Sequence, residues 1–147
     1  MNPDPEADRW YRTYPTFPGV ATCITLMQAG KARGTWLEII HHLWVEHASV
    51  IFDDLCTAYL HVEPVIQGYI VEAIAAARIP IAIPFLSAQL HSPVAVVHRW
   101  AIRGLAQLNT RESRRALWDA QTIQFDDPAT TAAFQQELGQ YLNRPSH

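Results

Sequence analysis

The sequence has few charges and no excess of positive charge. Only 17% of its 147 residues are charged, and the formal net charge at neutral pH is −3. Nucleic acids and anionic membranes attract proteins through positive charge, so this balance disfavours both as partners. Binding to DNA or RNA would need a local patch of basic side chains that works against the overall charge.

Long hydrophobic runs are also missing. A membrane-spanning helix needs about 20 consecutive apolar residues. The longest apolar stretch here, residues 74–86, is interrupted by Arg78, Pro80 and Pro84. An export signal consists of a basic segment followed by an apolar one, and residues 1–15 do not show this pattern. We therefore expect a cytoplasmic protein that does not enter the membrane.

Cysteine is scarce, and the motifs of common enzyme classes are absent. Cys23 and Cys56 lie in apolar helical patterns without a CxxC spacing, which predicts two buried free thiols. The sequence has neither GxSxG nor HExxH, and its glycines form no phosphate-binding loop. We therefore predict a non-enzymatic protein without a metal or other cofactor.

What the sequence does contain is an internal repeat, with a repeat length of about 31 residues. Apolar residues recur at this spacing in three columns, and the last step of the second and third columns is slightly longer than the others. The columns are Ile24, Leu55, Leu86 and Leu117; Leu43, Ile74, Leu105 and Leu138; and Ile39, Ile70, Ala101 and Phe134. We expect these residues to form the core.

Two kinds of helix are predicted to alternate around these columns, because the apolar positions follow helical spacing. The first kind is predicted at 18–29, 48–60, 80–90 and 111–121, and the second at 35–46, 64–77, 93–108 and 128–142. One helix pair could not bury its apolar face alone, so neighbouring pairs must stack. The sequence therefore predicts an all-α fold of about four stacked helix pairs.

Residues that favour helix starts agree with several of these boundaries. Ser92–Pro93 and Asp127–Pro128 each place a capping side chain before a proline at the first helical position. Asn109, with Glu112 three residues later, resembles a capping box.

The two ends of the chain are predicted to lie outside the repeat domain, which we assign to residues 18–143. Residues 1–17 are rich in proline and aromatic residues. We expect an extended arm whose aromatic side chains cap the first repeat, and the alternative is a disordered tail that ends before Trp10. The aromatic residues concerned are Trp10, Tyr11, Tyr14 and Phe17. Residues 144–147 are expected to fray.

The third unit, residues 92–109, resembles the HEAT-like repeat of the phycobilisome-lyase type. The second helix of that repeat carries a Val-Arg-x-x-Ala-x-x-x-Leu-Gly pattern. Val97, Ala101 and Leu105 match it, whereas His98 stands in place of Arg and Ala106 in place of Gly. The segment Ala82-Ile-Pro-Phe-Leu86 is similar to the first-helix pattern Ala-Val-Pro-x-Leu. The similarity is good over residues 79–121, fair over 48–78 and weak at both ends.

This resemblance implies a right-handed α-solenoid of about four HEAT-like helix pairs. In such folds the second helix of each pair lines a concave surface that binds a protein partner. The repeat identifies a fold and carries no catalytic motif, so it implies no bilin chemistry.

The repeat also predicts which side chains face the concave surface. Positions 38, 41 and 45 lie on the side of the first inner helix away from its apolar stripe, and steps of one repeat length extend them along the chain. The predicted partner-binding residues are Glu38, His41, Tyr69, Glu72, Trp100, Arg103 and Gln107. Tyr, Trp and Arg together are typical of binding hot spots. Alternatively, Tyr69 and Trp100 belong to the core between repeats.

Two further interpretations compete with a protein-binding surface. Glu38, His42 and Glu46 share one helix face and could present metal ligands, although exposed polar pairs explain the spacing more simply. Some HEAT-like proteins are DNA glycosylases, and in that class Arg99, Trp100 and Arg103 would line a DNA groove. We predict an adaptor, a regulatory subunit or an inhibitor of the immunity-protein type, with the DNA enzyme as the alternative.

Overall fold

The structure is a computed structural model that describes residues 17–30 and 34–142. All regular secondary structure in these two ranges is helical, which confirms the predicted all-α class. The α-helices are α2 (Val20–Gln28), α3 (Thr35–Tyr59), α4 (Pro64–Ala77), α5 (Ile83–Gln89), α6 (Ala95–Leu108), α7 (Arg111–Asp119) and α8 (Pro128–Leu142). The short 3₁₀ helices η1 (Pro80–Ala82) and η2 (Ala120–Thr122) adjoin α5 and α7.

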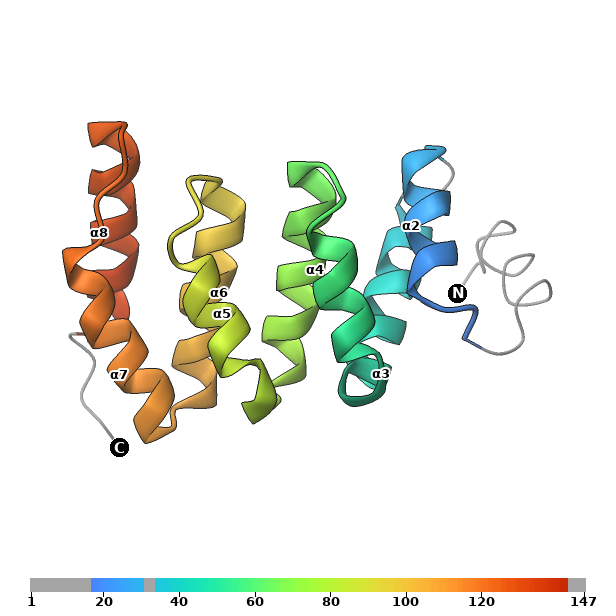
Figure 1. Cartoon of the computed structure of the whole chain (residues 1–147), viewed down its shortest axis with the longest axis horizontal. Coiled ribbons are helices and arrows are strands. Elements are labelled where there is room, and N and C mark those ends of the chain that lie inside the picture. The colour runs from blue at the N-terminus through green and yellow to red at the C-terminus, as the bar shows by residue number, and fades with distance from the viewer. Residues whose placement is uncertain (1–16, 31–33, 143–147) are drawn as a thin grey trace.

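The helices follow one another in chain order along the long axis of the molecule, from α2 at one end to α8 at the other (Figure 1). Helix α3 packs against α2 and α4, and α4 packs against α6. Helix α6 in turn contacts α5, α7 and α8. Packing is therefore chiefly between helices that are next to each other, or next but one, in the chain.

The repeat length reappears in the central helices. Helix α6 begins and ends one repeat length after α4, and both helices close on a residue with left-handed backbone. These residues are Arg78, with φ of 53°, and Asn109, with φ of 49°. A left-handed residue ends a helix by turning the chain away from its axis. The repeat is thus present in the backbone as well as in the apolar side chains.

The predicted columns belong to the core. Eleven of their twelve members are buried, and the exception is Leu43, which is half-buried. In the first half of α3 the fully buried positions are instead Ile40 and Trp44, one residue further along. The large indole is fully buried where α2, α3 and α4 meet, so the helix is turned by about one position from the register of the column.

Helix α3 differs from the prediction of two helices over 35–46 and 48–60, because it is continuous from Thr35 to Tyr59. It runs from alongside α2 to alongside α4 (Figure 1). Its buried residues Trp44, Ala48, Ile51 and Leu55 recur every three or four positions across the expected break. No glycine or proline interrupts this apolar stripe, so nothing in the local sequence ends the helix there.

The helix starts agree with the prediction in part. Helices α4 and α8 have the predicted bounds, and Asp127 caps α8 by accepting hydrogen bonds from the Ala129 amide at 3.2 Å and the Thr130 hydroxyl at 2.9 Å. These bonds lower the pKa of Asp127. Ser92 accepts from the Val94 amide at 3.2 Å, but α6 begins only at Ala95.

The capping box predicted at Asn109 and Glu112 was placed one residue too early. Thr110 caps α7 by accepting from the Ser113 amide at 3.1 Å, and the Ser113 hydroxyl accepts from the Thr110 amide at 2.8 Å. Asn109 instead closes α6 in the left-handed conformation.

The prediction of two buried free thiols is confirmed in part. Both cysteines are free, but Cys56 is half-buried, whereas Cys23 is buried as predicted. Burial raises the pKa of each thiol to about 11.

Phe17 stacks on His47 with ring centroids 5.0 Å apart, while the rest of the predicted arm and residues 144–147 lie outside the described residues. Among the helices described, none is long and apolar enough to span a bilayer.

Candidate binding site

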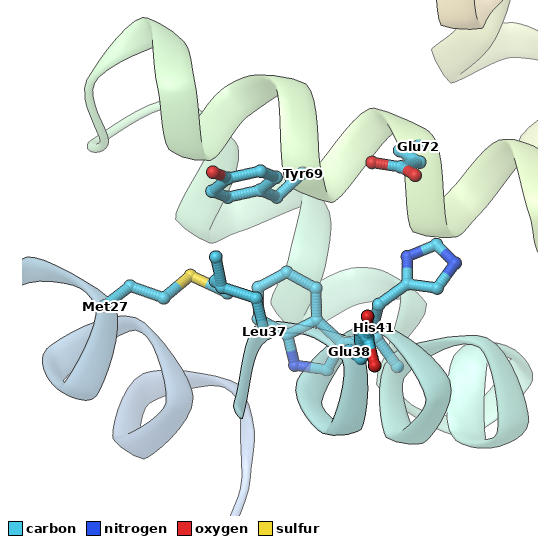
Figure 2. A pocket seen from close by; sticks show the side chains of 7 residues that line it. Met27, Leu37, Glu38, His41, Tyr69 and Glu72 are labelled. Atoms are coloured by element: carbon cyan, nitrogen blue, oxygen red, sulfur yellow. The ribbon is translucent and has the colours of Figure 1, made fainter. Parts of the chain in front are cut away.

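A pocket of about 240 Å³ lies where α2, α3 and α4 meet (Figure 2). It is lined by Met27 of α2, by Leu37, Glu38, His41 and Trp44 of α3, and by Tyr69 and Glu72 of α4. Four of these seven residues, namely Glu38, His41, Tyr69 and Glu72, are among the predicted partner-binding residues. The repeat brings them together because it places positions of equal register on adjacent helices.

Helical spacing positions the polar side chains around the pocket. Glu38 and His41 are three residues apart on α3, and Tyr69 and Glu72 are three residues apart on α4, so each pair shares one helix face. Figure 2 shows the two pairs on opposite sides of the pocket, with Met27 at one end. Trp44, one turn beyond His41, is fully buried and belongs to the base of the site.

The pocket combines an apolar wall with acidic groups. Met27, Leu37 and Tyr69 are half-buried and pack against the core, whereas Glu38 is exposed and Glu72 half-buried. None of the described residues that line the pocket is a lysine or an arginine. Within residues 17–30 and 34–142, neither carboxylate forms an ion pair or a hydrogen bond.

Trp100 and Arg103 of α6 do not line this pocket and instead contact each other. The Arg103 guanidinium lies over the Trp100 ring, 5.1 Å from the ring centre. Its Nε atom is 3.5 Å from a carboxylate oxygen of Glu137 on α8, which is close enough for an ion pair but long for a hydrogen bond. Trp100 is half-buried, so it lies neither wholly in the core nor free at the surface. Gln107, the last predicted residue, is exposed.

The repeat spacing does not predict four residues that the structure places beside the predicted ones, namely Met27, Leu37, Trp44 and Glu137. Trp44 follows His41 by one helical turn, so its place beside the site could have been found had the apolar stripe been assigned to Ile40 and Trp44. Met27 and Glu137 come from other helices, and no repeat spacing links them to the predicted rows.

His98, which replaces the arginine of the repeat pattern, is a core residue. It is 4% exposed, and its Nδ1–H donates to the Ser92 carbonyl oxygen at 2.8 Å. Its ring stacks on Phe125 and meets the edge of Phe134, with centroids 5.3 Å and 5.2 Å away. Burial is the main cause that lowers the pKa of His98.

His42, which follows the pocket residue His41 in α3, is exposed. His42 and Glu46 are exposed partners one turn apart, with the imidazole nitrogen 3.4 Å from a carboxylate oxygen. In the described part of the chain, no group of three potential ligands is arranged to hold a metal ion. The spacing of Glu38, His42 and Glu46 is therefore used here for a single solvent-exposed pair.

Comparison with known proteins gives no relative: no family model, no curated protein and no solved structure matches the chain.

Proposed function

We propose that this chain is a non-enzymatic protein-binding module that recognises its partner on the surface formed by α3, α4 and α6. The pocket between α2, α3 and α4 is the observation that carries the proposal. It places an aromatic ring, apolar side chains and carboxylates that pair with no described cation together at an accessible surface. Such a mixture of anchoring and orienting groups is typical of binding hot spots.

The architecture supports an α-solenoid of the HEAT-like type. Helices α4 and α6 have the same length and lie one repeat length apart in the sequence, and the helices pack on neighbours along the chain. Solenoids use the surface of successive equivalent helices to bind elongated partners. We infer a role as an adaptor, a regulatory subunit or an inhibitor of a partner protein.

The pocket gives no support to the alternative of a DNA glycosylase. A DNA groove relies on basic side chains that neutralise phosphates. The described residues that line this pocket include two carboxylates and no lysine or arginine. A protein partner is therefore the better proposal for the site.

The test compares partner capture by the wild type with capture by two aromatic variants. The bait is the tagged full chain, incubated with extract from its native source. Tyr69→Ala removes the aromatic wall of the pocket and should reduce capture at least about tenfold, as the loss of a hot-spot aromatic does. Trp118→Ala is the control, because Trp118 is 62% exposed on α7 and lies outside the pocket.

Equal capture by all three proteins would contradict the proposed surface. Thermal melts of the two variants must match the wild type closely enough to show that both are folded at the temperature of the assay. Duplex DNA is titrated in parallel over a range of salt concentrations. Binding to DNA that weakens steeply with salt would favour the nucleic-acid alternative instead.

A further inference from the structure

Two residues of the pocket, Tyr69 and Glu72, occupy positions in α4 that are equivalent to those of Trp100 and Arg103 in α6. Tyr69 precedes Trp100 by one repeat length, and Glu72 precedes Arg103 by the same distance. On α6 the aromatic ring is covered by an arginine three residues later, and the carboxylate of Glu137 lies beside that arginine. The molecule itself therefore contains one assembled cluster of an aromatic ring, a guanidinium and a carboxylate.

The equivalent position on α4 lacks the cation. The residue that corresponds to Arg103 is Glu72, and Glu38 adds a second carboxylate across the pocket. In the residues the structure describes, no arginine or lysine lies over Tyr69 or pairs with either carboxylate. Among those residues, the pocket thus has the aromatic and acidic parts of the α6 cluster, and two negative charges without a positive one.

The walls of the pocket suit the remainder of a long basic side chain. Met27, Leu37 and Tyr69 offer apolar surface on which methylene groups can pack while the charged end stays near solvent. A guanidinium matches this site better than an ammonium does. It is planar, stacks on aromatic rings, and can donate hydrogen bonds to two carboxylates at once.

We propose that the pocket binds an arginine side chain of the partner polypeptide. The guanidinium lies over Tyr69 between Glu38 and Glu72, and the methylene chain packs on Leu37 and Met27. This inference rests on the proposed function only in taking the partner to be a polypeptide. The chemistry of the pocket can be tested without that partner.

The ligand for the test is Nα-acetyl-arginine amide, added to the ¹⁵N-labelled full chain and followed by NMR. We expect saturable shifts of the Glu38, Tyr69 and Glu72 amide signals, with a Kd in the millimolar range that suits a single side chain. The citrulline derivative has nearly the same shape without the charge, and should produce no saturable shift. The lysine derivative should bind several-fold more weakly.

Two substitutions at one position and a control sharpen the test. Glu72→Gln should raise the Kd at least about fivefold, because it removes one charged acceptor. Glu72→Arg places an arginine three residues after Tyr69, as in the α6 cluster, and should abolish binding because the pocket is then occupied by its own chain. Glu112→Gln removes an exposed carboxylate on α7, outside the pocket, and should leave the Kd unchanged.

The inference is overturned if the arginine derivative causes no shifts at the pocket, if citrulline binds equally well, or if Glu72→Gln has no effect. Loss of capture with Tyr69→Ala, but no arginine binding, would leave the proposed function standing and remove this inference. If the wild type binds the arginine derivative but Tyr69→Ala captures the partner as well as the wild type does, the chemistry of the pocket is supported and its role as the partner surface is contradicted.

Discussion

At the scale of single residues, His98 shows how a polar side chain is accommodated in the core. The hydrogen bond from Nδ1–H to the Ser92 carbonyl fixes which ring nitrogen carries the proton in the neutral form. The aromatic rings of Phe125 and Phe134 enclose the imidazole, so a second proton would place a charge in an apolar environment. The neutral form of the side chain is therefore favoured in the core.

This arrangement predicts a loss of stability in mild acid. Burial lowers the pKa of His98 in the folded protein below the usual value of 6.5, although the bond to Ser92 and the Glu137 carboxylate oppose the shift. The unfolded chain then binds the proton more readily, so the free energy of unfolding falls as the pH drops below about 6.5 and levels off beneath the folded pKa.

Urea denaturation of the wild type and His98→Gln between pH 7.5 and 5 provides the measurement, with the other histidines common to both. We expect the unfolding free energy of the variant to depend less on pH. Identical slopes in the two proteins would show that the pKa of His98 is the same in the folded and unfolded states, which would contradict the prediction.

Residue burial was predictable from the sequence where side chains of similar size repeat. Leu55, Leu86 and Leu117 are all buried at the repeat spacing. The prediction was wrong at Leu43, because the neighbouring Trp44 is far larger and takes the core position. Periodicity records where apolar residues recur, but the competition between two adjacent apolar residues depends on the shape of the space that they fill.

At the scale of helices, α4 and α6 approach closely at Gly104. A Cβ atom added there would lie 2.8 Å from the Ala75 Cβ and 3.1 Å from both the Ala75 Cα and a Leu86 methyl carbon. The backbone of Ala75 cannot move aside as a long side chain could. The close contact of these two helices therefore depends on a glycine at this position.

Gly104→Ala is accordingly expected to destabilise the protein, although alanine favours helix by about 1 kcal/mol. Overpacking of a close contact costs about 1–3 kcal/mol, and a contact with the rigid backbone of Ala75 belongs in the upper part of that range. After the gain in helix propensity is subtracted, we expect a net loss of about 1–2 kcal/mol. Gly68→Ala on α4 is the matched control, because its added Cβ would meet only the Val96 side chain, at 3.0 Å. That side chain can rotate, so the control should be neutral or stabilising.

Chemical denaturation of both variants measures these effects, and Ala75→Gly combined with Gly104→Ala should recover part of the loss. A Gly104→Ala protein as stable as the wild type would show that α4 and α6 can separate without cost.

Helix positions were predictable where proline or a capping residue marks an end. Pro64 begins α4, and Asp127–Pro128 begins α8 as predicted. Helix α3 was predicted as two helices, because the repeat was extended through residues 46–48, where no local signal ends a helix.

The candidate site was predictable in part. Glu38, His41, Tyr69 and Glu72 share a repeat register, whereas the pairing of Arg103 with Glu137 depends on how α6 packs on α8.

At the scale of the whole molecule, the packing of each helix on near neighbours predicts that the chain opens in steps. Helix α6 contacts α4, α5, α7 and α8, whereas among the described helices the main contacts of α2 are with α3 alone. The buried apolar residues of α6 are fully enclosed, but Val20 and Ile24 of α2 remain slightly exposed. Where helices pack mainly on near neighbours, we expect local unfolding to start at the helix with the fewest neighbours.

Amide hydrogen exchange under native conditions should therefore be fastest in α2 and slowest in α6, with at least about a tenfold difference in protection. Equal protection in all helices would mean that the chain unfolds as a single unit. If α2 does detach first, Met27 leaves with it and the pocket loses one wall while α3 and α4 stay folded. Occupancy of the pocket would then slow exchange in α2 in particular, so hydrogen exchange in this helix would report the binding of a partner at the pocket.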